Sequence, residues 1–430
     1  MNFFKIWRHQ VDTQLDEMAE TFVEDFKPER KTVVLIPGFP GSNLIRSLVT
    51  YPQLDGKAYA RSNYNSTNSW HPMLPSSLKW ELAINPDGSD VDQHVILQNG
   101  PISVEIDFIF KFRVAPYEDA IEYFQSMQVN VLQFGNDFRR GFELAACNLI
   151  YLLSRINESA RKARKPIHFE NWSIAGHSFG GLIALAFANL CAGAESSVLS
   201  RLKANCFKSI GWPGNIFTVG APLYGSTNSA LVVYKGRGPL NDSLNPEKVP
   251  RIASTWLGLY DLFITPPEMF KDVQKRRKDL SLYPVRDYKT GKVLDPYQEV
   301  GRYPIWVSER SELLAESKAR KLRLLRHIPR ELKPRFFNLC GSELHTNQGY
   351  EWKALKGKDN KDIPFNIVEH SNPIRPFADD KGDGVVPTWS ACHADFETTD
   401  PNVIHLSDPV EHDNLMNSRE VLQEVMKRMK

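Results

Sequence analysis

The 430-residue chain has few cysteines, and their arrangement is not typical of a structural site. Zinc sites use closely spaced cysteines, and disulfide scaffolds use dense, even-numbered sets. Here no Cys-x-x-Cys pair occurs, and the cysteines are an odd number at wide spacings: Cys147, Cys191, Cys206, Cys340 and Cys392. The sequence therefore predicts neither a zinc site nor a disulfide scaffold, but free thiols in a reducing compartment.

Long hydrophobic runs are also lacking. No stretch approaches the ~18 apolar residues of a transmembrane helix, so we do not expect an integral membrane protein. The first residues lack the apolar segment of a secretory signal. Instead, Phe3, Trp7, Val11 and Leu15 recur at helical spacing, which predicts an amphipathic helix within residues 1–28, packed on the body of the protein. Binding to a membrane or a partner is the alternative role of this helix. We expect a cytoplasmic location, with peripheral contact to a membrane.

The chain as a whole carries little excess charge. Its net charge is +2 at pH 7, which gives no reason to expect a nucleic-acid partner. Residues 271–335 differ, because they contain 18 Lys and Arg against nine Asp and Glu, interleaved with leucines and aromatics. Such a segment suits an acidic, apolar partner such as a phospholipid surface. A solvated, charged helix is the alternative interpretation.

The most informative stretch is Trp172–Gly181, which contains the pattern Gly-x-Ser-x-Gly. An apolar strand precedes the pattern and an alanine-rich helix follows it, as in the nucleophile elbow of an α/β-hydrolase. Gly176 and Gly180 flank a sharp turn at which the backbone comes too close for a Cβ atom. The turn lifts the Ser178 hydroxyl above the sheet at the N-terminus of a helix, so we expect Ser178 to be a nucleophile.

A second glycine-rich turn follows an early buried strand. Residues 31–36 are a β-branched apolar run, and they end in Pro37–Ser42. Hydrolases of this fold place an oxyanion donor at such a turn, and a second donor follows the nucleophile. We therefore assign the oxyanion hole to the backbone N–H groups of Phe39 and Phe179.

Apolar strands alternate with helical patterns four times before residue 230, and a core pattern resumes with strands near 335–340, 364–368 and 403–406. This rhythm predicts an α/β-hydrolase fold with a mostly parallel, doubly wound sheet and an inserted cap or lid. The predicted divisions are the N-terminal helix at 1–28, the first part of the core at 29–225 with an irregular insertion at 50–105, a basic cap at 226–335, and the second part of the core at 336–430.

The acid and the base should follow the serine in the order Ser, acid, His. Asp383 lies between two glycines on a sharp turn, which favours it over Asp379 and Asp380. His412 lies in the loop after the last strand, where the base is expected. His393 is the alternative base, and His405 should point into the sheet's packing from inside the last strand.

Five ordered blocks together resemble lecithin–cholesterol acyltransferase-like lipases, in particular the bacterial branch of that family. The blocks are Pro37–Ser42, Asn136–Arg139, Gly176–Gly181, Gly220–Ser226 and Gly382–Pro387. The resemblance implies a cap and lid, action on glycerolipid esters, no metal or other cofactor, and catalytic roles for Ser178, Asp383 and His412. The second block departs from the family's usual Tyr-Asp-Trp-Arg, which bears on headgroup or acceptor preference.

The predicted function is therefore a serine lipase or phospholipase A-type hydrolase that forms an acyl-enzyme. Lipid O-acyl transfer through the same acyl-enzyme is one alternative. A thioesterase or a catalytically idle scaffold is an alternative of another class. The predicted partners are a lipid or membrane-surface substrate and a regulatory protein or a second copy of the chain. A phospholipase kept inside its own cell would damage membranes, so we expect it to be inactive until triggered.

Overall fold

The computed structural model describes residues 3–39, 41–50, 69–70, 82–85, 90, 94–101, 104–107, 111–114, 116–201, 211–235, 248–276, 280, 283–287, 289–300, 303–356, 362–369 and 381–429. Cys206, Asp379 and Asp380 lie outside these residues, so their predicted roles are not placed.

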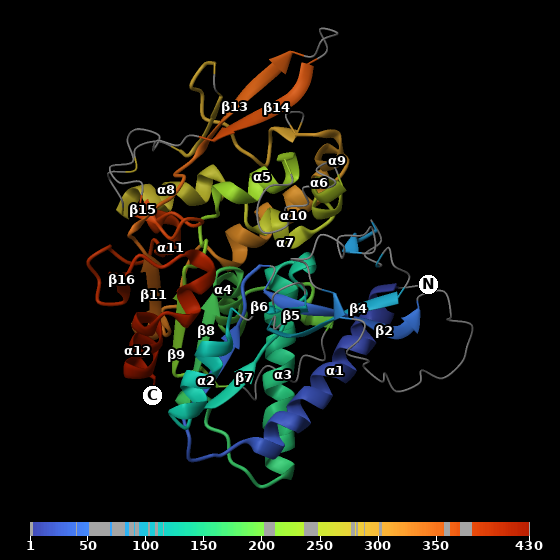
Figure 1. Ribbon diagram of the computed structural model, residues 1–430, viewed down its shortest axis with the longest axis vertical. Coiled ribbons are helices and arrows are strands. Elements are labelled where there is room, and N and C mark those ends of the chain that lie inside the picture. The colour runs from blue at the N-terminus through green and yellow to red at the C-terminus, as the bar shows by residue number, and fades with distance from the viewer. Residues whose placement is uncertain are drawn as a thin grey trace.

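A six-stranded sheet forms the centre of the molecule (Figure 1). Its order is β16-β11-β9-β8-β1-β7, and every pair of neighbours is parallel. The strands are β1 (Thr32–Ile36), β7 (Asn130–Gln133), β8 (Trp172–His177), β9 (Asn215–Val219), β11 (Phe336–Gly341) and β16 (Val403–Leu406). Because β8 and β1 are central, the two glycine-rich turns that follow them lie side by side at the carboxyl edge of the sheet.

The alternation of side chains along β1 explains why this strand is apolar at every position. Val34 and Ile36 pack in one buried cluster, whereas Val33 and Leu35 pack in another on the opposite face. The helices that supply the first cluster are α1 (Phe3–Asp25), α3 (Phe142–Lys162) and α4 (Phe179–Cys191). Those that supply the second are α2 (Glu118–Ser126) and α12 (Arg419–Arg428). The fold is thus α/β and doubly wound, as predicted.

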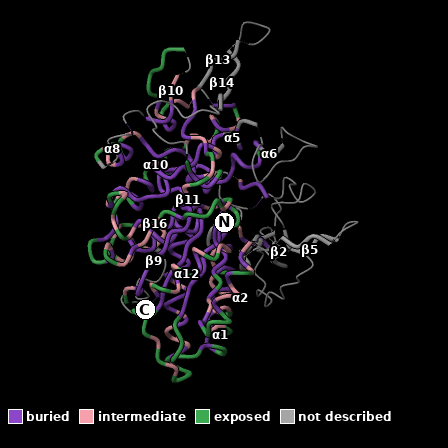
Figure 2. Tube along the Cα trace, turned by 60° about the vertical axis from the view of Figure 1, so that its left-hand side comes forward, coloured by how far each residue is buried: buried purple, intermediate pink, exposed green. Residues whose placement is uncertain are grey.

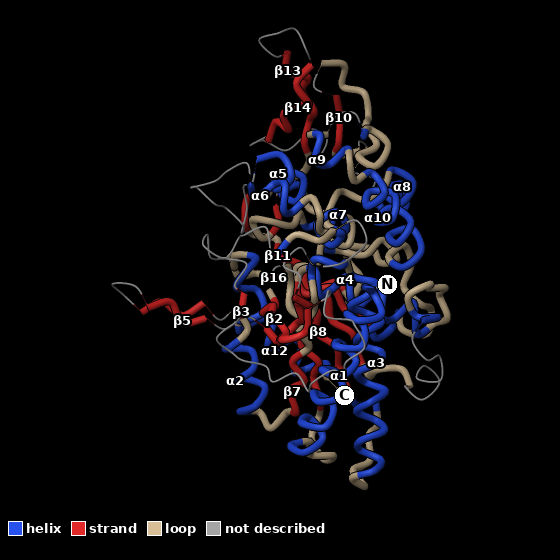
Figure 3. Tube along the Cα trace, turned by 90° about the vertical axis from the view of Figure 1, so that its right-hand side faces the viewer, coloured by secondary structure: helices blue, strands red, loops and turns tan. Residues whose placement is uncertain are grey.

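Helix α1 lies along α3 (Figures 1 and 3). Trp7, Val11 and Leu15 are buried, which agrees with their helical spacing. Polar contacts join the two helices as well, since the Tyr151 hydroxyl donates to Asp16 over 3.1 Å. No helix among the described residues is long and apolar enough to cross a membrane.

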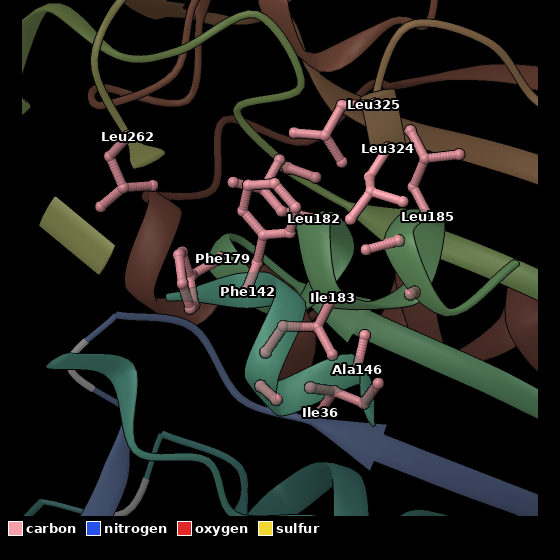
Figure 4. Packing of buried hydrophobic residues seen from close by; sticks show 14 of the residues in the cluster. Ile36, Phe142, Ala146, Phe179, Leu182, Ile183, Leu185, Leu262, Leu324 and Leu325 are labelled. Atoms are coloured by element: carbon pink, nitrogen blue, oxygen red, sulfur yellow. The ribbon is translucent and has the colours of Figure 1, made fainter. Parts of the chain in front are cut away.

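A group of helices covers the carboxyl ends of the strands, and we call it the cap (Figure 1). Its helices are α5 (Thr227–Lys235), α6 (Lys248–Ala253), α7 (Leu257–Asp261), α8 (Pro267–Arg276), α9 (Ile305–Ser308) and α10 (Ser311–Leu324). One buried cluster continues from the core into the cap (Figure 2). In Figure 4, Leu262, Leu324 and Leu325 of the cap region lie around Phe142 and Phe179, at the starts of α3 and α4.

Several basic side chains of the cap form ion pairs with carboxylates. Arg320 and Arg323 both reach the buried Glu143 of α3, at 3.2 and 2.6 Å. Lys318 pairs with Asp295 at 2.9 Å. These ion pairs attach α10 to the core and to the rest of the cap, and a basic surface for lipid stays a prediction.

Two predictions about strands need correction. The strand near 364–368 is not part of the core sheet, because β14 (Asp362–Glu369) pairs with β13 (Tyr350–Lys356) in a separate sheet that also contains β10 (Val285–Asp287). The stretch 50–105 is not irregular throughout, because β4 (His94–Pro101) pairs with β2 (Ser42–Thr50). The short remaining elements are β3 (Ser69–Trp70), β5 (Val104–Asp107), β6 (Lys111–Val114), β12 (Leu344–His345), β15 (Lys381–Gly382) and α11 (Thr388–Ala391).

The close approach of β8, α4 and β1 depends on Gly180. A Cβ atom there would lie 2.2 Å from the carbonyl oxygen of Ile36. We predict that Gly180→Ala lowers the free energy of unfolding by roughly 1–3 kcal/mol in urea titration, because the backbone must shift to relieve the overlap. Gly211→Ala is the control, since a Cβ atom at Gly211 meets nothing within 4 Å. Equal stability of the two variants would contradict the prediction.

Candidate active site

Ser178 lies between the end of β8 and the start of α4, in a backbone conformation that is rare for a residue with a side chain. Its φ is 52° and its ψ is −121°. The turn is held by the Ser178 N–H, which donates to the Val219 carbonyl at 2.9 Å, and by the Gly181 N–H, which donates to the Ser178 carbonyl at 2.9 Å. Gly176 makes the crossing possible, because a Cβ atom there would lie 2.3 Å from the Gly180 carbonyl oxygen. This strained turn has the geometry of a nucleophile elbow.

Ser178, His412 and Asp383 are joined by hydrogen bonds although they are far apart in the chain. The distance from Ser178 Oγ to His412 Nε2 is 2.8 Å, and that from His412 Nδ1 to Asp383 Oδ2 is 2.7 Å. All three are buried, with exposed fractions of 7%, 6% and 1%. In the tautomer that fits both contacts, Nδ1–H donates to the carboxylate and Nε2 accepts the hydroxyl proton of Ser178.

The neighbours of Asp383 fix its two carboxylate oxygens in different roles. Oδ1 accepts from the N–H groups of Val385 and Val386, at 3.0 and 2.7 Å, which leaves Oδ2 for the imidazole. Gly220 and Gly341 provide the space: a Cβ atom at Gly220 would lie 2.9 Å from Oδ2, and one at Gly341 would lie 2.6 Å from Asp383 Cβ. The sequence reasoning had not assigned a role to these two glycines.

Burial and the carboxylate act in opposite directions on His412. Burial lowers the pKa of His412, but the charge of Asp383 and its hydrogen bond raise it, and the raising effects prevail. The pKa therefore lies above its ordinary value of 6.5. This is the environment of a base that accepts a proton readily.

The turn that carries Phe39 lies directly beside Ser178. A Cβ atom at Gly38 would be 2.8 Å from Ser178 Cβ and 3.3 Å from Ser178 Oγ. The turn is closed by the Gly41 N–H, which donates to the Gly38 carbonyl at 2.8 Å. Phe179 is the first residue of α4, where N–H groups have no partner within the helix. The two amides assigned from the sequence thus belong to turns on either side of the serine.

A buried chain of hydrogen bonds connects this turn to the loop of His412. The Gly38 N–H donates to the Tyr117 hydroxyl at 2.7 Å, and that hydroxyl lies 2.9 Å from His177 Nδ1. His177 Nε2 lies 2.9 Å from the His412 carbonyl oxygen. A carbonyl only accepts, so Nε2 carries the proton and Nδ1 accepts from Tyr117. The sequence reasoning missed this chain, although His177 stands within the glycine-serine pattern itself.

His177 is held in its neutral form. Burial, followed by the nearby His412, lowers the pKa of His177 to about 3. Burial also raises the pKa of Tyr117. The donor and acceptor roles of Tyr117 and His177 in these hydrogen bonds therefore stay the same over the pH range in which His412 titrates.

Four aromatic side chains pack against one another near Ser178, since one of them is the next residue in the sequence. We call them the aromatic cluster: Phe39, Phe138, Phe179 and Trp256. The ring of Phe39 makes edge contacts with the other three, at centroid distances of 4.9, 6.0 and 6.1 Å. Trp256 comes from the residue before α7 of the cap, so the aromatic cluster is shared by core and cap.

The block Asn136–Arg139 is structural in its contacts. The buried Arg139 makes a bidentate pair with Asp137, at 2.8 and 2.7 Å, and lies 2.9 Å from Asp90. Asn136 supports the turn Pro37–Ser42, because its N–H donates to Ser42 Oγ at 2.9 Å and its Nδ2 donates to the Pro37 carbonyl at 3.3 Å. Asn136 and Phe138 of this block therefore support the turn and belong to the aromatic cluster.

The other two histidines weighed as bases do not lie with Ser178. His393 is fully buried, and its Nε2 lies 3.1 Å from the Leu325 carbonyl oxygen. His405 is exposed and its Nε2 lies 3.3 Å from the Thr398 carbonyl oxygen, so the prediction that it points into the packing of the sheet is wrong. β16 is the edge strand of the sheet, so no further strand lies beyond it to cover the side chain of His405.

Comparisons with known proteins give a fold but no family. No family model matches the chain, and no curated protein matches it as a relative. A similar solved structure is described as the crystal structure of the Tle4–Tli4 complex. The match has a TM-score of 0.55 and 13% identity, and it covers 93% of this chain and 99% of the other. With its six-stranded parallel sheet, the chain has an α/β-hydrolase-like fold.

The Tyr117 hydroxyl should stabilise the fold measurably. Tyr117→Phe leaves the Gly38 N–H and His177 Nδ1 without their buried partner, so we predict a loss of about 1–3 kcal/mol in the free energy of unfolding. Tyr123→Phe, in helix α2 directly after Tyr117 but partly exposed, should change it by less than about 0.5 kcal/mol. The measurement is urea unfolding monitored by circular dichroism, and equal values for both variants would refute the role given to Tyr117.

Proposed function

We propose that the protein is a serine hydrolase that cleaves fatty acyl esters of glycerolipids, with Ser178 as nucleophile, His412 as general base and Asp383 as the acid that orients the base. One observation carries the proposal: the hydrogen bonds of 2.8 and 2.7 Å that run from the serine through the imidazole to the carboxylate. A nucleophile bonded to a base that a third group orients is the arrangement required for acyl transfer to a serine.

In this mechanism, Ser178 Oγ attacks the ester carbonyl while His412 Nε2 takes its proton. The Asp383 carboxylate stabilises the imidazolium that forms. The N–H groups of Phe39 and Phe179 donate to the negative oxygen of the tetrahedral intermediate, and each such donor lowers the barrier by about 3 kcal/mol in comparable sites. His412 then returns the proton to the leaving alcohol, and water releases the acyl group by the same steps.

The surroundings of Ser178 favour an acyl chain as the group that is bound. Phe39 of the aromatic cluster belongs to the turn beside Ser178, and aliphatic residues of core and cap continue the same buried cluster, including Leu182 and Leu262. Apolar surface beside a few fixed polar groups is typical of sites for such ligands. The resemblance to lecithin–cholesterol acyltransferase-like lipases points to the same substrate class.

A closed site supports the proposal that activity needs a trigger. Ser178 is only 7% exposed, so a lipid reaches it only after part of the cap moves. Contact with a membrane surface, a protein partner or a second copy of the chain would each supply this trigger. The similar solved chain was crystallised in a complex of two proteins, Tle4 and Tli4, which supports a protein partner here.

The proposal predicts that Ser178→Ala abolishes both ester hydrolysis and labelling by a fluorophosphonate. Loss of the nucleophile should lower kcat by at least about 10⁴-fold. Ser173→Ala is the matched control, since Ser173 lies in β8, the strand that ends just before Ser178, and its buried hydroxyl has no partner in the described part of the chain. Mass spectrometry locates the label, and a phospholipid and lysolipid product screen identifies the bond. Labelling at another residue would rule out Ser178 as nucleophile.

The pH dependence tests the roles of His412 and Asp383. His412 acts as a base only when neutral, and its pKa is raised, so kcat/KM should fall as the pH drops through a value above 6.5. Asp383→Asn removes the charge that raises this pKa. We therefore predict that the acid limb of the pH profile, where kcat/KM falls, moves to lower pH and that kcat falls by roughly 10⁴-fold.

Asp413→Asn serves as the control for this pH experiment. Asp413 is exposed, and its charge raises the pKa of His412 less than the charge and the hydrogen bond of Asp383 do. The variant should keep its rate and shift the acid limb only slightly. If Asp383→Asn leaves the limb where it is, the proposed pairing of His412 with Asp383 is wrong.

A further inference from the structure

Two cysteines meet in the interior, far from each other in the sequence. Cys340 is in β11, and Cys392 directly follows α11. Their Sγ atoms are 2.9 Å apart, and both residues are buried. No disulfide joins them in this structure. We propose that Cys340 and Cys392 are an oxidation site that forms an intramolecular disulfide.

Hydrogen bonds on both sides of the pair hold the two backbones in place. On one side, the Thr388 hydroxyl donates to the Gly341 carbonyl at 3.0 Å. On the other, the His393 N–H donates to Asn338 Oδ1 at 3.2 Å. A disulfide has an S–S distance of about 2.05 Å, so the sulfurs need to approach by less than about 1 Å, which side-chain rotation supplies.

The bond would secure a segment that contacts both core and cap, residues 388–395, which we call the clasp. Within it, Ser390 Oγ donates to the Gly225 carbonyl at 2.6 Å, and the Ala394 N–H donates to the Tyr224 hydroxyl at 2.7 Å. Asp395 accepts from the Ile328 N–H at 2.7 Å, just beyond α10. Oxidation therefore ties the junction of cap and core to the central sheet.

The other described cysteines differ in their surroundings. Burial raises the pKa of Cys147 to about 12, and it also raises that of Cys191. The sulfur of Cys147 contacts Ser196 Oγ at 3.9 Å, which is a contact with a hydroxyl and not with another sulfur. In the described part of the chain, no contact joins the sulfur of either residue to another sulfur, so neither is placed to form an intramolecular disulfide as Cys340 and Cys392 are.

The oxidant that the reaction requires is a low-molecular-weight disulfide. Cys392 is 8% exposed and Cys340 is 0% exposed, so Cys392 reacts first. The Cys392 thiolate attacks one sulfur of the oxidant and releases one thiol, leaving a mixed disulfide. The Cys340 thiolate then attacks Cys392 Sγ and releases the second thiol. Two protein thiols lose two electrons to the oxidant, and the two released thiols carry the two protons.

We predict that oxidised glutathione converts this pair, and not Cys147 or Cys191, to a disulfide in the folded full-length protein. After incubation, the protein is denatured, alkylated and digested without reduction. Mass spectrometry should then find Cys340 and Cys392 unalkylated and in one cross-linked peptide, whereas the reduced protein is alkylated at both. Alkylation of both after oxidation, or a cross-link to a different cysteine, would overturn the proposal.

Thermal unfolding gives a second, independent readout. The closed loop spans 52 residues in sequence separation, and oxidation should raise Tm by about 4 °C, reversibly with dithiothreitol. Cys392→Ser should lose this oxidant-dependent rise, whereas Cys191→Ser should keep it. A rise that persists in Cys392→Ser would show that another site is oxidised.

Discussion

The close crossing of backbone at the carboxyl edge of the sheet is the constraint on which the site depends. The turn after β8 passes against the end of β1 so tightly that Gly180 has no room for a Cβ atom beside the Ile36 carbonyl. Packing of α3 and α4 against the sheet maintains this crossing, because their buried faces belong to one continuous cluster. The positive φ of Ser178 is therefore a strain that the surrounding core stabilises.

The same edge gathers residues from five separate parts of the chain. Tyr117 and His177 link the turn of Gly38 to the backbone of His412, while Asp383 holds the imidazole from the other side. Because His177 remains neutral, its two ring nitrogens keep one donor and one acceptor role. The loop of His412 is thus positioned by a residue next to Ser178, which couples His412 to the turn of Gly38.

Local pattern was sufficient for most strands of the central sheet and for the residues that meet at Ser178, because each depends on short segments with strong signals, whereas β14 was assigned to the wrong sheet. The glycines around Ser178 and Asp383 mark their turns directly, and the order of elements indicates His412. The contacts of Tyr117 could not be predicted, since its partners are 60 or more residues away and no local pattern marks them. The ion pair of Arg320 with Glu143 could not be predicted for the same reason, because a charge run does not reveal which charges meet a carboxylate.

The cap is attached in a way that limits how the site can open. Asp261 of α7 accepts from the Phe142 N–H at the start of α3, and Arg320 of α10 pairs with Glu143 one residue further on. Removing one partner of a buried pair leaves an uncompensated charge, which typically costs several kcal/mol. Movement of the whole cap away from α3 would expose these groups together with the leucines shown in Figure 4. Access to Ser178 is therefore better explained by rearrangement within the cap than by its detachment.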